Sequence, residues 1–131
     1  IPVGCEQGCW YEPTLLSGLD QHSPVVQTES FGPLLILSDA DDMNEALQQV
    51  NGVEQGLTAT CYCDDLKLQQ QFLESAETGI LWMQGRPAAI DPWAPFGGWK
   101  ASAIGPPEHG QWDRVFYSRP QAVYGGAAEL E

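Results

Sequence analysis

The chain has 131 residues, 43% of them hydrophobic, and its 18 acidic residues against five basic ones give a formal net charge of −13. This length suits one domain over residues 1–131, and the negative charge repels phosphate backbones and anionic lipid headgroups, so we expect no nucleic acid and no membrane partner. No apolar run approaches the ~20 residues that span a bilayer, and no signal-peptide pattern is present, so we expect a cytoplasmic protein.

The first predicted elements are two strands. Residues 8–16 mix aromatic, β-branched and leucine side chains before a polar turn, which predicts a short edge or connecting strand. Residues 34–37 form a continuous apolar run between a Gly-Pro pair and a Ser-Asp pair, which is typical of a strand covered on both faces in a parallel sheet.

Two amphipathic helices are predicted next. The apolar stripe of the first, which acidic residues precede and Gly52 ends, consists of Met43, Ala46, Leu47 and Val50. The stripe of the second, which begins after Asp64 and Asp65 and ends before Gly79, consists of Leu68, Phe72, Leu73 and Ala76. Residues 57–63 and 80–83 read as strands on either side of this second helix.

This alternation of strands and helices with short links predicts an α/β fold in which consecutive βαβ units form a partial parallel sheet. A long loop rich in proline and glycine should follow at residues 86–107, and its three aromatic side chains argue that it is ordered. A short helix at 111–117 and a last strand at 121–124 complete the prediction.

Four cysteines raise the questions of disulfides and metal. Cys61 and Cys63 should share one face of a strand ~6.6 Å apart, an awkward separation for a disulfide. Cys5 and Cys9 lack the usual Cys-x-x-Cys spacing of a zinc site. We therefore expect free thiols in a reducing compartment and no bound metal.

Two short strings of residues carry the most functional information. They are Glu29-Ser30-Phe31-Gly32-Pro33 and Pro95-Phe96-Gly97-Gly98-Trp99-Lys100-Ala101-Ser102. Together with the elements between them, they resemble the C-terminal part of the catalytic region of NAD(P)-dependent aldehyde dehydrogenases, over roughly residues 8–124. The resemblance implies the α/β fold of that catalytic domain, with residues 120–131 as an oligomerisation strand and tail.

The resemblance also implies roles for four residues. Glu29 would accept hydrogen bonds from the nicotinamide ribose, and Phe31 would lie beside the nicotinamide ring. Phe96 would line the substrate passage, together with Gln84, which stands where the family usually has an asparagine. Considered without the resemblance, the residues favour a solvated surface acid at Glu29 and core aromatics at Phe31 and Phe96.

The implied parent enzyme is an oxidoreductase that oxidises aldehydes to acids with NAD or NADP. The cysteine nucleophile and the cofactor-binding domain of that enzyme would lie upstream of this segment. We therefore predict that the segment contains no catalytic residue and has no turnover by itself. It need not bind the cofactor on its own. The alternative is a non-catalytic assembly module that self-associates or pairs with a larger aldehyde dehydrogenase subunit through the strand at 121–124. Either way, uncovered apolar faces predict a homo-oligomer, dimeric or larger.

Overall fold

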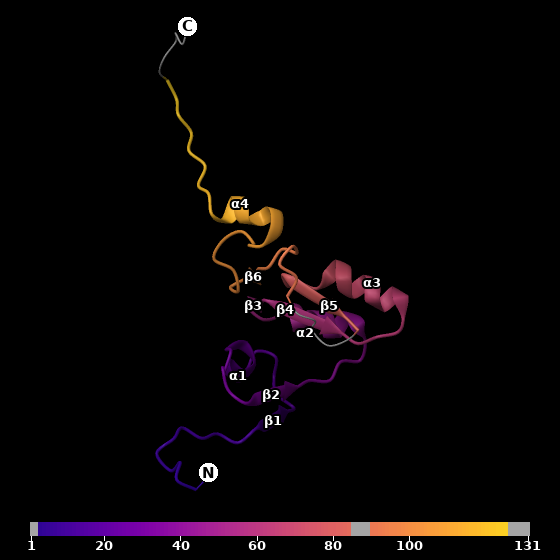
Figure 1. Cartoon of the computed structure of the whole chain (residues 1–131). Helices are drawn as coiled ribbons and strands as arrows, with labels where there is room; N and C mark the ends of the chain where they lie inside the picture. Colours follow the sequence, from indigo (N-terminus) through magenta and orange to yellow (C-terminus); the bar gives the residue numbers. More distant parts are fainter. Residues whose placement is uncertain (1–2, 85–89, 126–131) are drawn as a thin grey trace.

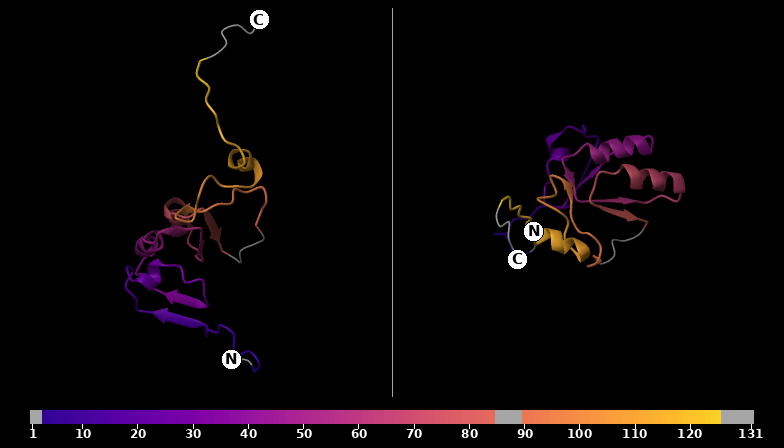
Figure 2. Two further views of the ribbon diagram at one scale, coloured as in Figure 1. Left: turned by 90° about the vertical axis from the view of Figure 1, so that its left-hand side faces the viewer. Right: turned by 90° about the horizontal axis from the view of Figure 1, so that it is seen from above.

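The computed structural model of the protein describes residues 3–84 and 90–125. The chain is elongated, with its N-terminal strands at one end, a layer of helices and strands in the middle, and a C-terminal tail that extends away from the body (Figures 1 and 2). None of the helices in the described residues is long and apolar enough to cross a lipid bilayer.

The N-terminal unit is a parallel pair of strands. Strands β1 (Thr14–Ser17) and β2 (Leu34–Leu37) pair with Thr14 opposite Leu34, and the crossover between them contains the short helix α1 (Pro24–Gln27). The predicted strand at 34–37 is confirmed. The prediction of a strand from residue 8 is wrong, because the strand begins only at Thr14, after a proline that has no N–H to donate to a ladder.

One face of this strand pair is uncovered. The side chains of Leu15, Leu35 and Leu37 are 61%, 66% and 54% exposed, while their neighbours along each strand are half-buried. The expectation that residues 34–37 are covered on both faces is therefore wrong in this chain, because among the described residues only one side of β2 has packing partners.

The two predicted helices are confirmed as α2 (Met43–Asn51) and α3 (Leu66–Ser75). Each begins at an aspartate whose carboxylate accepts backbone N–H groups of the first turn. The Asp42 carboxylate accepts from Glu45 N at 2.9 Å, and the Asp65 carboxylate accepts from Lys67 N and Leu68 N at 2.7 and 3.2 Å. These caps supply partners to N–H groups that a helix start leaves unpaired, which fixes where both helices begin.

Helix α3 connects the second parallel pair, β4 (Thr58–Cys61) and β5 (Ile80–Met83), in which Thr58 lies opposite Ile80. This confirms one predicted βαβ unit. The other predicted unit, β2-α2-β4, is not formed, since β2 and β4 belong to different strand pairs. The chain leaving α2 instead forms β3 (Gln55–Gly56), which pairs antiparallel with β6 (Trp99–Lys100).

The core is small and lies between α2, α3 and the β4–β5 pair. Its buried side chains are Leu47, Cys61, Phe72 and Ala76, and half-buried methionine, leucine and cysteine side chains pack against them. The accessible surface of the chain is 10900 Å². A compact monomer of 14.3 kDa exposes roughly 6800 Å². The chain thus exposes far more surface than a compact monomer of its mass, in keeping with its elongated shape.

The C-terminal third contains little regular structure. The predicted Pro/Gly loop falls partly on residues 85–89, which lie outside the described residues; its described part includes β6 and a bridge between Phe96 and Glu108. The 3-10 helix η1 (Gly110–Trp112) and helix α4 (Asp113–Phe116) confirm the predicted short helix. The predicted strand at 121–124 does not form, because this exposed segment has no strand edge beside it among the described residues.

Candidate functional site

Glu29 and Phe31 lie together in the loop between α1 and β2. Both line an open hollow of about 350 Å³ whose remaining walls come from α1 and from the apolar side chains of β2. Among the described residues, no hydrogen bond or ion pair engages the Glu29 carboxylate. Its oxygens are therefore available to a ligand that offers hydrogen-bond donors.

The backbone of Phe31 turns its ring outward. Its φ of +47° lies in the left-handed region, which is costly for an aromatic residue, and its side chain is 92% exposed. An exposed apolar ring at the edge of an open hollow is accessible to a flat, apolar part of a ligand. The structure thus places both predicted cofactor residues in the wall of one hollow. Among the described residues, the Glu29 carboxylate has no hydrogen-bond or ion-pair partner, and the Phe31 ring is exposed.

Phe96, in the C-terminal third of the chain, is held by backbone pairing. Its N–H and C=O bond to the Glu108 backbone at 2.8 and 2.9 Å, and its ring stacks on His109 with ring centroids 5.3 Å apart. It borders an apolar hollow of about 310 Å³ that Trp82 of β5 and Ile90 also line. Phe96 is therefore fixed in place and faces a space that suits an apolar group.

Gln84 does not line the hollow that Phe96 borders. Its side-chain amide donates to the Cys63 carbonyl and to the Asp64 carboxylate, the latter at 2.9 Å. These bonds tie the end of β5 to the start of α3. The structure thus separates the two predicted substrate residues, and the roles of Glu29, Phe31, Phe96 and Gln84 stay predictions.

The four cysteines do not form a catalytic or metal-binding cluster. All are free thiols; Cys5 and Cys9 are exposed, and burial raises the pKa of the Cys61 thiol, with a smaller contribution from the nearby Cys63. Within residues 3–84 and 90–125, no group of three or more His, Cys, Asp or Glu side chains is arranged to hold a metal ion.

The sequence model of the aldehyde dehydrogenase family matches residues 2–123. The chain belongs to the aldehyde dehydrogenase family. It is 33% identical to 2,5-dioxopentanoate dehydrogenase of Saccharolobus solfataricus, over 92% of this chain and 25% of that protein. It is 31% identical to betaine aldehyde dehydrogenase of Vibrio vulnificus, over 92% of this chain and 24% of that protein.

A solved aldehyde dehydrogenase has the same fold in the corresponding region. The structure of the Mycobacterium tuberculosis aldehyde dehydrogenase complexed with NAD⁺ matches with a TM-score of 0.77 and 27% identity, over 91% of this chain and 24% of that one. This chain thus spans about a quarter of the length of the relatives it matches. The resemblance predicted from the two strings is confirmed at the level of the family.

One residue whose structural role the sequence reasoning missed is Lys100. Its ammonium group donates to the carbonyls of Asn51 and Val53 at 2.7 and 3.3 Å and pairs with the Glu77 carboxylate at 3.1 Å. It thereby places a positive charge at the negative end of helix α2 and anchors β6, which directly follows the glycine pair after Phe96. The sequence did offer a signal for this role, because Lys100 is a lysine within the second string of a chain that has only five basic residues.

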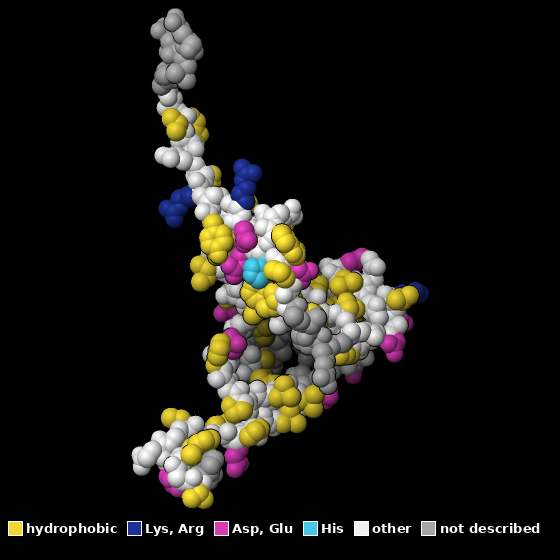
Figure 3. All heavy atoms as spheres, in the orientation of Figure 1, with side chains coloured by type: hydrophobic (Ala, Val, Ile, Leu, Met, Phe, Trp, Pro, Cys, Tyr) yellow, Lys and Arg dark blue, Asp and Glu magenta, His cyan; other side chains and the backbone are white. Residues whose placement is uncertain are grey.

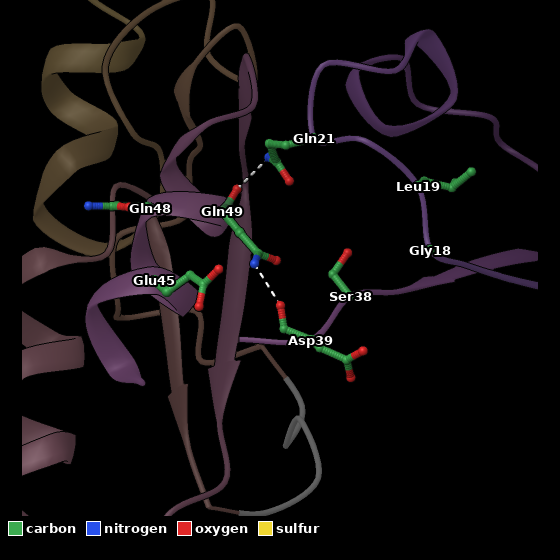
Figure 4. A pocket seen from close by; sticks show the side chains of 8 residues that line it. All are labelled: Gly18, Leu19, Gln21, Ser38, Asp39, Glu45, Gln48 and Gln49. Carbon is green, nitrogen blue, oxygen red and sulfur yellow. Dashed lines mark hydrogen bonds between the residues drawn. The ribbon is translucent and has the colours of Figure 1, made fainter. Parts of the chain in front are cut away.

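A third hollow, of about 340 Å³, lies between the N-terminal unit and α2 (Figure 4). Across it, the Gln21 amide donates to the Gln49 carbonyl at 2.9 Å, and the Gln49 amide donates to the Asp39 carbonyl at 2.8 Å. These bonds connect the unit that carries Glu29 and Phe31 to the rest of the molecule. The hollow contains none of the predicted site residues.

Proposed function

We propose that residues 1–131 serve as the C-terminal segment of the catalytic region of an NAD(P)-dependent aldehyde dehydrogenase, with Glu29 and Phe31 in contact with the cofactor. One observation carries this proposal: a carboxylate without a described partner and an outward-facing aromatic ring line the same open hollow. A dinucleotide presents both a pair of ribose hydroxyls and a flat aromatic ring, which this arrangement suits.

The two side chains have different roles in this proposal. The Glu29 carboxylate accepts hydrogen bonds from adjacent ribose hydroxyls, and such charge-assisted bonds are about twice as strong as neutral ones. The Phe31 ring limits where the nicotinamide can lie, so it orients the reacting ring. When bound, NAD(P)⁺ supplies a hydride acceptor for the oxidation of an aldehyde.

Phe96 is proposed to border the aldehyde in its apolar hollow, where it would exclude water and orient the substrate. Gln84 remains a weaker candidate, because its amide must leave the Asp64 carboxylate before it can reach a substrate carbonyl. We assign no catalytic residue to this segment. The nucleophile and the activity of the whole protein belong, in this proposal, to the part of the family's chain that precedes these residues.

The test is a calorimetric titration of the purified chain with NAD⁺ and NADP⁺. Glu29→Ala should weaken binding by roughly tenfold or more, since each charge-assisted hydrogen bond contributes about 1.5–3 kcal/mol. Glu74→Ala removes an exposed carboxylate on α3, which contributes no residue to the lining of the hollow, and is the matched control. Equal affinities of the two variants would contradict the role of Glu29.

A second candidate function is supported by the tail. Residues 118–125 are exposed and form no strand, and Val123 and Tyr124 are 82% and 93% exposed. An extended, apolar segment of this kind suits strand addition to another subunit. We propose this assembly role as the alternative. It predicts an oligomer that binds neither NAD⁺ nor NADP⁺. Production of NADH from a panel of aldehydes by residues 1–131 alone would contradict both candidate functions.

A further inference from the structure

One asparagine side chain joins the ends of helices α2 and α3. Asn51 is the last residue of α2, and its side-chain nitrogen donates to the carbonyl of Ser75, the last residue of α3, at 2.8 Å. Its side-chain oxygen accepts the Glu77 N–H, also at 2.8 Å. The junction thus uses both the donor and the acceptor of one amide, and an ionised carboxylate has no donor to offer in its place.

The residue that follows makes this amide chemically labile. Gly52 has no Cβ to hinder its backbone nitrogen, so in a flexible chain that nitrogen can attack the side-chain carbonyl carbon of Asn51. The new C–N bond closes a succinimide ring, while the side-chain nitrogen takes up the Gly52 N–H proton and leaves as ammonia. Water then opens the ring at either carbonyl and leaves aspartate or isoaspartate. The net reaction consumes one amide and one water, and it needs no oxidant or reductant.

In the folded chain, both reacting groups are held by hydrogen bonds. The Gly52 N–H donates to the Gln49 carbonyl at 3.2 Å, and the Asn51 side chain is bonded at its nitrogen and at its oxygen. The ammonium group of Lys100 also binds the Asn51 backbone carbonyl at 2.7 Å. The attack therefore requires the end of α2 to open first, with the loss of several of these bonds.

We propose that Asn51 is a modification site, which deamidates when the junction of α2 and α3 opens and whose product cannot restore that junction. The new carboxylate faces the Ser75 carbonyl and lies at the C-terminal ends of both helices, where the helix dipole disfavours a negative charge. Residues 3–84 already contain 13 acidic residues and one basic residue. In Figure 3, acidic side chains are spread over the visible surface, and the visible basic ones lie chiefly near the tail. Deamidation thus converts a transient opening into a lasting loss of stability.

The kinetics of deamidation test the protection by the fold. The full chain is incubated at mildly alkaline pH, folded in buffer or unfolded in guanidinium chloride, and peptides with Asn, Asp or isoAsp at position 51 are separated and quantified by mass spectrometry over time. The folded chain should react at least roughly tenfold more slowly, because only its open form reacts. Asn44 is the internal control: it is the only other asparagine, it precedes Glu45 rather than a glycine, and it should keep its amide in both conditions. Gly52→Ala should slow the reaction of the unfolded chain.

Encoded variants test the consequence of the modification directly. Asn51→Asp should lower the equilibrium constant of folding at least roughly tenfold in urea titrations, because it removes one hydrogen bond and adds a repulsive charge. Asn44→Asp is the matched control, since Asn44 lies in the first turn of the same helix, where a carboxylate is favoured and can still accept from the Gln71 amide. Equal reaction rates of the folded and unfolded chains, an Asn51 amide that persists in the unfolded chain, or equal stability of the two variants would each overturn the proposal.

Discussion

Gly79, which directly precedes β5, lies against the backbone of the loop that carries Phe96. A Cβ added at Gly79 would lie 1.9 Å from the Gly97 carbonyl oxygen and 3.0 Å from the Gly98 Cα. Both are backbone atoms, so no flexible side chain can move aside. The Gly79 N–H also donates to the Gly56 carbonyl at 3.0 Å, so β5 cannot retreat without loss of that bond.

Gly79→Ala should therefore destabilise the chain by about 2–4 kcal/mol. Overpacking against fixed atoms costs about 1–3 kcal/mol, and weakening of the hydrogen bond to Gly56 adds about 0.5–1.5 kcal/mol. Because small domains are stable by only about 5–15 kcal/mol, this change should shift the urea midpoint of unfolding clearly.

The matched control is Gly105→Ala, since a Cβ at Gly105 meets no atom within 4 Å and its φ is not in the left-handed region. That variant should lie within about 0.5 kcal/mol of the parent, the usual range for surface substitutions. Equilibrium unfolding in urea, followed by circular dichroism, compares the three proteins. Equal midpoints for Gly79→Ala and Gly105→Ala would show that the loop is not packed against β5 as described.

Three further predictions concern side chains that hold the fold. The hydrogen bond from Glu45 N–H lowers the pKa of the Asp42 carboxyl below its usual 3.8. The stability that this bond contributes is therefore present above pH 3.8 and is lost as the pH falls below it. Asp42→Asn should abolish this contribution to the loss of stability in acid. Iodoacetamide should alkylate Cys5 well before Cys61, whose pKa is raised by burial, as timed peptide mass spectrometry will show. Lys100→Met should lower the free energy of unfolding by about 1–3 kcal/mol in urea titrations, because it leaves the carbonyls of Asn51 and Val53 without their donor.

Local chemistry made much of this fold predictable. The aspartates before α2 and α3, and the apolar residues spaced at three and four along each helix, predicted both helices, and the structure has them. The strands at 34–37 and 80–83 were predicted because short apolar runs stand between turn residues. In each case the determining interactions lie within one helix or one strand, where sequence spacing reports them directly.

The failures share a physical cause, which is dependence on a distant partner. A strand at 121–124 needs a neighbouring edge, and whether one is present cannot be read from the segment itself. The absence of pairing between β2 and β4 is likewise a property of the whole sheet. The same limit hid Lys100 and its bond to Glu77, since the two residues lie far apart in sequence.

The unit that carries Glu29 and Phe31 is joined to the rest of the chain largely through glutamine side chains. Gln21, Gln27 and Gln55 each donate a hydrogen bond across this boundary, at 2.9, 2.9 and 3.3 Å. Such bonds contribute only about 0.5–1.5 kcal/mol each, and none of the four buried core side chains belongs to this unit. Changes at the Phe96 loop should therefore leave dinucleotide affinity at Glu29 nearly unaltered, so Gly79→Ala and Glu29→Ala should act on separate properties, stability and cofactor binding.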